Sequence, residues 1–502
     1  MFKTLDKFLN RITMYKLVMY SLVVLLFWAY GVSLAGKLPF HASDLVYTIE
    51  FLIASNWVLN KLFAWIFRVP ANVESPYITA MILALIISPA ADQAGFLFLF
   101  WASLIAMGSK YLIAYRRRHI FNPAALAVVA TFYLLGMGAS WWVGNVWMVI
   151  PVIIMGVLFV RKTRRWNMVY TFLAVTILTT LAFSLYEGAA IGPVLKALVV
   201  YSPLVFFATV MFTEPATTPP TQRLQIIYGI IVGVLASPFT HFGNFYMTPE
   251  LALVFGNVYS YAVGSKERLQ LTLAQKRELS GNVWEFVFEP LKFKFRPGQY
   301  LEWTIRHKAD LRGNRRYFTI ASSPTEDNLR LGVKFYDKSS SFKKTLQDLP
   351  PGSKLFAGQL AGDFTLPSDP SKKLVFIAGG IGITPYRSML KYLLDKNEKR
   401  PAILFFSNRN ADEIVYRDVL DEASEKLGIK TVYTLTGDVP ADWAGERGRL
   451  DADKIVRHVP DYKERTFYIS GTQNMVTSTK DLLSGMGVAG RRIKTDFFPG
   501  YV

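Results

Sequence analysis

Long apolar runs separated by short polar loops fill the first half of the chain, whereas short alternating segments fill the second half. The apolar runs are typical of membrane-spanning helices in length and hydropathy. The pattern therefore predicts a polytopic α-helical membrane domain of about ten helices over residues 1–265. The expected spans are 13–35, 44–67, 76–89, 94–115, 123–138, 141–160, 166–186, 191–213, 224–238 and 248–264.

The first run ends in Ser33-Leu34-Ala35, a small-residue ending that also suits a cleaved signal peptide. Its apolar stretch is long and further runs follow at once, which favours an uncleaved helix.

Basic residues alternate from loop to loop along the first half. They gather at the N-terminus and in every second loop, as at Arg68, Arg161 and Arg223, while the other loops carry almost none. This positive-inside pattern predicts a multi-pass protein of the inner or cytoplasmic membrane with both termini in the cytosol.

The first half also suggests an internal repeat. Run three ends in Ile87-Ser88-Pro89 and run eight in Thr213-Glu214-Pro215, while Asn122-Pro123 precedes run five as Thr248-Pro249 precedes run ten. These correspondences predict an inverted five-plus-five repeat with a site at broken helices.

The second half reads as two further domains. Alternating segments between 270 and 304 predict an antiparallel β-barrel domain over residues 266–368. Strand-like runs at 374–378, 402–406, 430–435 and 465–470 alternate with helical segments, which predicts a Rossmann-like nucleotide-binding domain over residues 369–502.

The segment Arg316-Tyr317-Phe318-Thr319 combines a cation, a ring and a hydroxyl. Arg316 and Phe318 lie two residues apart and so share one face of a strand, with Thr319 at its end. Such a strand can hold a pyrophosphate, stack a ring and donate a hydrogen bond to it. Downstream, Lys334, Ser340, Ser341 and Lys343 offer cations and hydroxyls for a phosphate, and Val333 and Phe342 are expected to line the same site.

A glycine-rich turn follows the apolar run 374–378. Its residues Gly379, Gly380, Gly382, Thr384 and Pro385 permit close approach of a dinucleotide to the backbone. Asn408 and Arg409, after the next strand, are expected at the adenosine end. Because no clear acidic ligand for the adenosine ribose follows, the sequence does not separate NADH from NADPH as the coenzyme.

The composition of the chain excludes several partners and kinds of catalysis. The chain is 52% hydrophobic and has a net charge of +19, but much of that charge lies in loops between apolar runs, so we expect no nucleic-acid partner. The absence of cysteine excludes disulfides, Cys-ligated clusters and thiol catalysis. No metal site is expected.

The C-terminal motifs together resemble the ferredoxin–NADP reductase superfamily. The resemblance implies FAD at Arg316, Phe318 and Thr319, and NAD(P)H at the glycine turn, with Gly362 and Phe364 joining the lobes. Ser470-Gly471-Thr472, before Met475, stands where the family often has Cys-Gly-Pro. A C-terminal aromatic, here Tyr501, covers the flavin in the family. The resemblance therefore implies Thr319, Ser470 and Tyr501 as catalytic residues.

The stretches 117–125 and 211–221 resemble the membrane flavin subunits of the Rnf complex (D subunit) and of Na+-translocating NADH:quinone reductase (B subunit). The resemblance implies an FMN-type flavin near His119, Asn122, Pro123, Thr213, Glu214, Thr217 and Thr218. Glu214 replaces the usual Asp, and a Ser/Thr-Gly-Ala-Thr acceptor is missing, which argues against covalent attachment.

The resulting prediction is a transmembrane electron-transfer oxidoreductase in the lipid bilayer. Electrons would pass from NAD(P)H to FAD, to a membrane flavin, and on to a quinone or an extracytoplasmic acceptor. Two alternatives stay open: a haem-containing ferric reductase or NADPH oxidase-like enzyme, and a redox-driven ion pump. His41, His119 and His241 all fall in expected loops, which disfavours bis-histidyl haem.

Overall fold

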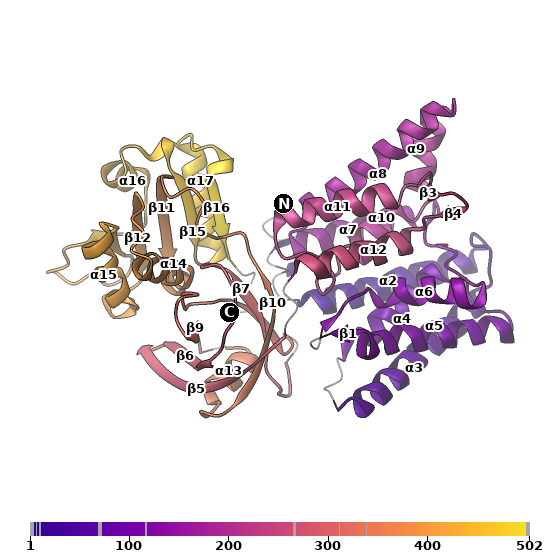
Figure 1. Cartoon of the computed structure of the whole chain (residues 1–502), viewed down its shortest axis with the longest axis horizontal. Helices are drawn as coiled ribbons and strands as arrows, with labels where there is room; N and C mark the ends of the chain where they lie inside the picture. The colour runs from indigo at the N-terminus through magenta and orange to yellow at the C-terminus, as the bar shows by residue number, and fades with distance from the viewer. Residues whose placement is uncertain are drawn as a thin grey trace. The chain divides into compact units, whose positions relative to one another are not determined.

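The computed structural model describes residues 5–6, 8–9, 12–68, 73–115, 118–264, 268–310, 312–337 and 339–497 of the chain. Contacts between Cα atoms divide the chain into two units, Met1–Arg268 and Leu269–Val502. The first unit is helical and the second contains both large sheets (Figure 1).

The helical unit has a helix within each expected span. The helices are α2 (Met14–Leu34), α3 (Ala42–Ile66), α4 (Glu74–Ile86), α5 (Gln93–Leu112), α6 (Pro123–Leu135), α7 (Val149–Thr163), α8 (Trp166–Tyr186), α9 (Ile191–Val200), α10 (Leu204–Phe206), the π-helix η1 (Phe207–Met211), α11 (Gln222–Leu235) and α12 (Pro249–Val263).

Two spans differ from the expectation. The sixth begins at Val149 rather than near residue 141, because Asn145 accepts hydrogen bonds from the backbone N–H groups of Trp147 and Met148 and holds turns there. The eighth breaks before Leu204, where the pair α9 and α10–η1 bends by 55°. Pro203 lies at the break and cannot donate to a continuing helix.

Among the described residues of the helical unit, only some helices have the length and apolar composition needed to cross a membrane. Three helices, α2, α5 and α8, are long and apolar enough, and the bent pair α9 to η1 makes a fourth if it counts as one span. Helices α4, α6 and α11 are apolar but shorter.

The two halves of the unit share a local plan. A two-stranded hairpin, β1 (Ala114–Tyr115) with β2 (Arg118–His119), precedes α6, and another, β3 (His241–Phe242) with β4 (Phe245–Tyr246), precedes α12. Both helices carry Pro at the first turn and a side-chain cap, from Asn122 in α6 and Thr248 in α12.

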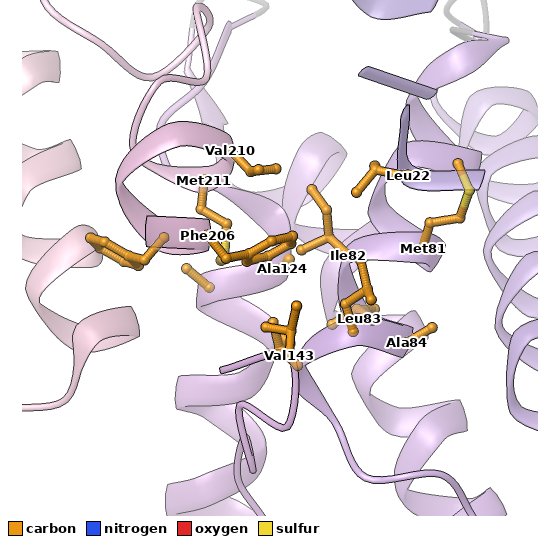
Figure 2. Close-up of a cluster of buried hydrophobic side chains, with 14 of the residues drawn as sticks. Leu22, Met81, Ile82, Leu83, Ala84, Ala124, Val143, Phe206, Val210 and Met211 are labelled. Atoms are coloured by element: carbon orange, nitrogen blue, oxygen red, sulfur yellow. The ribbon is translucent and has the colours of Figure 1, made fainter. Parts of the chain in front are cut away.

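The centre of the helical unit is filled by side chains from both halves. Figure 2 shows Ile82 and Leu83 of α4 between Met81 and Ala84 on one side and Phe206 and Met211 of α10 and η1 on the other. These side chains are buried in one hydrophobic cluster. The short third helix of the first half therefore packs in the same core as the broken helix of the second.

Helices α8 and α11 approach closely through glycine. A Cβ on Gly229 would lie 3.0 Å from the Met168 carbonyl oxygen, and one on Gly233 would lie 3.0 Å from the Val175 side chain. The Thr176 hydroxyl donates to the Gly233 carbonyl at 3.1 Å. This spacing of small residues is typical of helix pairs in lipid.

The second unit begins with a six-stranded antiparallel sheet in the order β8-β7-β10-β5-β6-β9. This part is called the barrel below, and the part built on the parallel sheet is called the nucleotide lobe. Its strands enclose a hydrophobic core around Trp303, against which the first turns of α13 (Ser341–Asp348) pack through Phe342 and Leu346. The strands are β5 (Leu269–Ser280), β6 (Val283–Pro290), β7 (Tyr300–Thr304), β8 (Arg315–Thr319), β9 (Asn328–Lys334) and β10 (Lys354–Ala361).

A parallel sheet in the order β14-β13-β12-β11-β15-β16 completes the unit. Separate hydrophobic clusters line its two faces, so the central strand β11 is buried on both sides, as its continuous apolar sequence predicts. The strands are β11 (Leu374–Gly379), β12 (Ala402–Asn408), β13 (Lys430–Leu435), β14 (Glu446–Arg447), β15 (Thr466–Ser470) and β16 (Ile493–Asp496); the main helices are α14 (Thr384–Asp395), α15 (Arg417–Leu427), α16 (Ala452–His458) and α17 (Gln473–Gly485).

Candidate functional site

The glycine turn lies where strand β11 passes into helix α14, at the carboxyl edge of the parallel sheet. Gly380 has a φ of +53°, and a short 3-10 helix (Gly380–Ile383) leads into α14, which has Pro385 in its first turn. The Thr384 hydroxyl donates to the Ile381 carbonyl at 3.2 Å. This is the position in which open sheets of this kind bind nucleotides.

The turn packs directly on the end of β15. A Cβ on Gly382 would lie 2.4 Å from the Ser470 carbonyl oxygen, and one on Gly379 would lie 2.0 Å from the Met475 sulfur. Thr472 caps α17 by accepting from the Met475 N–H. Gly379 and Gly382 belong to one sequence motif, Ser470, Gly471 and Met475 belong to another segment, and the structure brings the two together.

Asn408 ends β12 at the same edge of the sheet. Its side chain is 3% exposed, and both amide atoms are buried without a hydrogen-bond partner among the described residues. Leaving such a group unpaired costs about 1–3 kcal/mol. The aliphatic part of Arg409 lies against Gly437 next to it. A polar ligand such as an adenosine moiety would satisfy the Asn408 amide.

Strand β8, which contains the segment 316–319 singled out in the sequence, places its side chains alternately on two faces, as the strand period predicts. The Arg316 guanidinium lies 5.4 Å from the Phe342 ring centroid, and the Phe318 ring lies 6.0 Å from the same ring. Tyr317 lies on the other face, where its ring meets the Tyr300 ring edge-on. Thr319 is buried at the end of the strand, paired with Tyr300 of β7.

Three cations gather where helix α13 begins. Burial, with Arg316 and Arg312 nearby, lowers the pKa of Lys343 to about 8. The Lys343 ammonium donates to the Lys334 carbonyl at 2.8 Å, and the Ser340 hydroxyl caps the helix by accepting from the Lys343 N–H. A cluster of like charges with a helix N-terminus fits a pyrophosphate.

A carboxylate that the sequence analysis did not single out joins this helix end. Asp310 accepts from the Ser341 N–H at 2.9 Å, and its own N–H donates to the Ser341 hydroxyl. Burial alone would raise the pKa of Asp310, but these hydrogen bonds and Arg312 together lower it to about 2. Asp310 therefore stays ionised and neutralises part of the cationic cluster.

Gly362 and Phe364 lie between the barrel and the nucleotide lobe. Gly362 has a φ of +116°, and a Cβ there would lie 3.1 Å from the Tyr300 ring. Phe364 is buried against the rings of Tyr386 and Tyr468. Val333 is buried in the barrel core, and Lys334 forms an ion pair of 3.0 Å with Glu413 of the nucleotide lobe. Tyr501 lies outside the described residues.

The polar residues expected in the helical unit meet around Glu214. Its carboxylate accepts from the Asn122 amide at 2.9 Å and from the Thr217 hydroxyl at 3.2 Å, and the His119 ring nitrogen lies 3.6 Å away. Pro123 follows Asn122 in the first turn of α6. Residues from two separate sequence motifs therefore form one cluster.

A cation and two further hydroxyls extend this cluster. Arg165, at the start of α8, donates to the Thr213 carbonyl at 3.0 Å and to the Thr218 hydroxyl. The Thr213 hydroxyl donates to the Thr209 carbonyl at 2.6 Å. The cluster thus offers cationic, hydroxyl and carboxylate groups within the helical unit.

Sequence reasoning missed Asn257 in α12. Its side-chain oxygen accepts from the Asn122 N–H at 2.7 Å, and its amide donates to the Tyr228 hydroxyl at 3.1 Å. Asn257 lies nine positions after Thr248, inside an apolar run, and a buried Asn in such a run was the available signal. Lys110 of α5, bonded to Ser75 and Thr79, was missed for the same reason.

Comparison with known proteins gives a match in each half. Residues 376–481 match the oxidoreductase NAD-binding domain, and residues 133–266 match the NQR2, RnfD, RnfE family. The chain is 28% identical over 246 residues to a flavohemoprotein of Bacillus subtilis, covering 47% of this chain and 61% of the relative. It is 26% identical over 213 residues to a glycine betaine monooxygenase reductase subunit of Pseudomonas aeruginosa, covering 42% and 58%.

Among solved structures, the chain is similar to an Amycolatopsis cytochrome P450 reductase at 24% identity, with a TM-score of 0.41 over 46% of this chain and 70% of that one. A ferredoxin NADP+ reductase from Neisseria gonorrhoeae with bound FAD and NADP gives 18% identity and a TM-score of 0.40, over 46% and 98%. The chain spans about three fifths of the length of the curated relatives named above.

The matched domain, residues 376–481, covers the glycine turn and most of the parallel sheet, so the second unit contains a module similar to oxidoreductase NAD-binding domains. The chain joins this module to a helical region similar to the NQR2, RnfD, RnfE family. Both resemblances expected from the sequence are confirmed.

Proposed function

We propose that this protein is an NAD(P)H-oxidising transmembrane reductase with two flavins. The observation that carries the proposal is the union, in one chain, of an oxidoreductase NAD-binding domain and a region similar to the NQR2, RnfD, RnfE family. FAD would lie in the barrel and a non-covalent FMN-type flavin in the helical unit. The final acceptor would be a quinone or an extracytoplasmic acceptor.

The residues of the second unit fit FAD and a nicotinamide dinucleotide. Arg312, Arg316 and Lys343 would hold the pyrophosphate, and Phe318 and Thr319 would contact the ring. The glycine turn gives a dinucleotide access to backbone, because side chains there would collide with Ser470 and Met475. When bound, FAD supplies the conversion of a two-electron donor into single electrons.

The polar cluster in the helical unit suits a second flavin. Arg165 and Thr218 would contact its phosphate or ribityl chain, and Glu214 would accept a hydrogen bond from a ring or ribityl donor. In this arrangement the membrane domain is multi-pass and both termini are cytosolic, as the distribution of basic loops supports.

Acid extraction and counting of flavins per chain tests the proposal. The wild-type protein is expected to release FAD and a second flavin, whereas Asn122→Ala and Thr218→Ala should retain FAD and lose the second flavin. Thr248→Ala is the matched control, because it removes the equivalent cap from α12 at a similar cost of about 1 kcal/mol. One flavin in the wild type, or two in the Asn122 and Thr218 variants, would contradict the proposal.

A visible spectrum separates this function from a haem-bearing reductase. Of the histidines that the structure describes in the helical unit, His41 immediately precedes α3, and His119 and His241 lie in hairpins. Bis-histidyl haem requires such ligands to face each other inside helices. Flavin bands without a Soret band are therefore expected.

One observation favours redox-driven ion transport as a second candidate. Glu250, 6% exposed, accepts from the Trp141 indole at 3.1 Å in the first turn of α12, the counterpart of α6. Buried carboxylates in apolar helices often mark ion pathways. Ion uptake into proteoliposomes on adding NAD(P)H, and its loss in Glu250→Gln, would support this candidate.

A further inference from the structure

At Gly332 the barrel and the nucleotide lobe of the second unit approach without room for a side chain. A Cβ on Gly332, in the edge strand β9, would lie 2.7 Å from the Tyr416 hydroxyl and 2.9 Å from the Thr384 methyl group. Contacts below 3.0 Å require a neighbour to move, and the nearest neighbour, Tyr416, is buried. Glycine at this position therefore sets how close β9 and the glycine turn can come.

A clasp of hydrogen bonds holds the two lobes at this spacing. Arg387, in the first turn of α14 and 5% exposed, donates to both carboxylate oxygens of Glu326 in the barrel and to the Ala321 carbonyl at 3.1 Å. The Ser388 hydroxyl donates to the Ser322 carbonyl at 2.6 Å.

The clasp is anchored deeper in the barrel. Arg330 lies 3.2 Å from Glu326 and 2.9 Å from Glu285, and Glu285 is fully buried and also paired with Arg277. Planar guanidinium–carboxylate pairs of this kind fix orientation as well as distance. Arg387 is therefore linked through Glu326 and Arg330 to the buried carboxylate of Glu285.

The clasp is close in sequence to Thr319 of strand β8 and to Thr384 of the glycine turn. Ala321 follows Thr319 by two residues, and Arg387 follows Thr384 by three. A change in the clasp would therefore shift strand β8 relative to the glycine turn, because only two or three residues separate the clasp from each of them.

We propose that Gly332 and the Arg387–Glu326 clasp are positioning elements that set the distance between the nicotinamide and flavin rings. The inference rests on the proposed function. When both are bound, NAD(P)H would supply a hydride with its two electrons and FAD would accept it, so that the coenzyme would be oxidised and the flavin reduced. Such a transfer requires reacting atoms about 3–3.5 Å apart, so displacements of a few tenths of an ångström matter.

The test is Gly332→Ala in the full-length flavin-loaded protein. At saturating NAD(P)H, the rate of flavin reduction in stopped flow is expected to fall about tenfold, because the added methyl group separates the lobes. FAD content and affinity for ADP-ribose, which would contact only the nucleotide lobe, are expected to stay unchanged, and stability is expected to fall only by the overpacking cost of about 1–3 kcal/mol. The long-wavelength charge-transfer absorbance of stacked nicotinamide and flavin rings should weaken in parallel.

A second-site variant separates positioning from simple destabilisation. Tyr416→Phe removes the atom closest to the new methyl group, so the Gly332→Ala/Tyr416→Phe pair should recover much of the rate relative to Tyr416→Phe alone. Gly281→Ala is the matched control, because a Cβ there meets nothing within 4 Å.

The outcomes distinguish the two claims. Wild-type protein that neither NADH nor NADPH reduces would refute the proposed function, and the inference with it. Wild-type protein that is reduced, together with a Gly332→Ala variant of equal rate or one whose loss follows FAD content and is not rescued by Tyr416→Phe, would overturn the inference alone.

Discussion

At the scale of single residues, the charge of Lys343 is expected to change with pH slightly above neutrality. Its pKa of about 8 means that the ammonium is protonated near neutral pH and becomes neutral as the pH rises further. A bound pyrophosphate would favour the protonated form, so binding above pH 8 must take up a proton. FAD affinity should therefore decrease as the pH rises through about 8.

The corresponding substitution is Lys343→Met, measured by FAD binding to the apoprotein. We expect affinity about ten- to a hundredfold weaker at pH 7, since charged hydrogen bonds contribute about 1.5–3 kcal/mol. The variant should also lose the pH dependence near 8. Lys344→Met, at an exposed neighbouring position, should behave as the wild type. Equal weakening by both substitutions would show that general charge, not this site, is responsible.

Residue positions could be predicted from sequence where a local period determines them. Arg316 and Phe318 share a face because strand side chains alternate, and both meet Phe342 as that rule requires. Asp310 and Asn257 could not be found this way, because each acts through a partner far along the chain, Ser341 and Asn122. Such pairs depend on tertiary contacts that no local pattern records.

At the scale of elements, the glycine turn offers a matched comparison. In Gly382→Ala the new methyl group would meet the Ser470 backbone, which cannot move without disturbing β15. In Gly379→Ala it would meet the end of the Met475 side chain, which can adopt another rotamer.

We therefore expect Gly382→Ala to weaken NAD(P)H binding by at least about tenfold and to lower stability by about 1–3 kcal/mol, and Gly379→Ala to have a smaller effect on both. Coenzyme titration and thermal unfolding measure these effects. Similar losses in both variants would mean that Met475 is held as firmly as the backbone.

Element types were more predictable than their bounds. Apolar length located helices in each expected span, and β11, β12, β13 and β15 occur where the buried runs predict them. The late start of α7 and the bend before α10 escaped prediction, because Asn145 and Pro203 lie inside runs whose average hydropathy still suits a span. Average hydropathy does not register one capping side chain or one missing N–H.

At the scale of the whole molecule, the two units have separate hydrophobic cores. One cluster fills the helical unit, and three others fill the barrel and both faces of the parallel sheet. We therefore expect residues 269–502 expressed alone to fold, bind FAD and pass electrons from NAD(P)H to a soluble one-electron dye. Circular dichroism, flavin content and dye reduction check this. An aggregated or flavin-free product would show that the module depends on the helical unit.

The glycine contact between α8 and α11 bears on how the protein can be purified. Gly229, Gly233 and the Thr176 hydroxyl hold these helices by van der Waals fit and a hydrogen bond, neither of which needs water to be driven out. A micelle of long alkyl chains offers nothing that competes with such a seam. Mild solubilisation should leave these two helices joined, and bulky side chains in place of either glycine should separate them first.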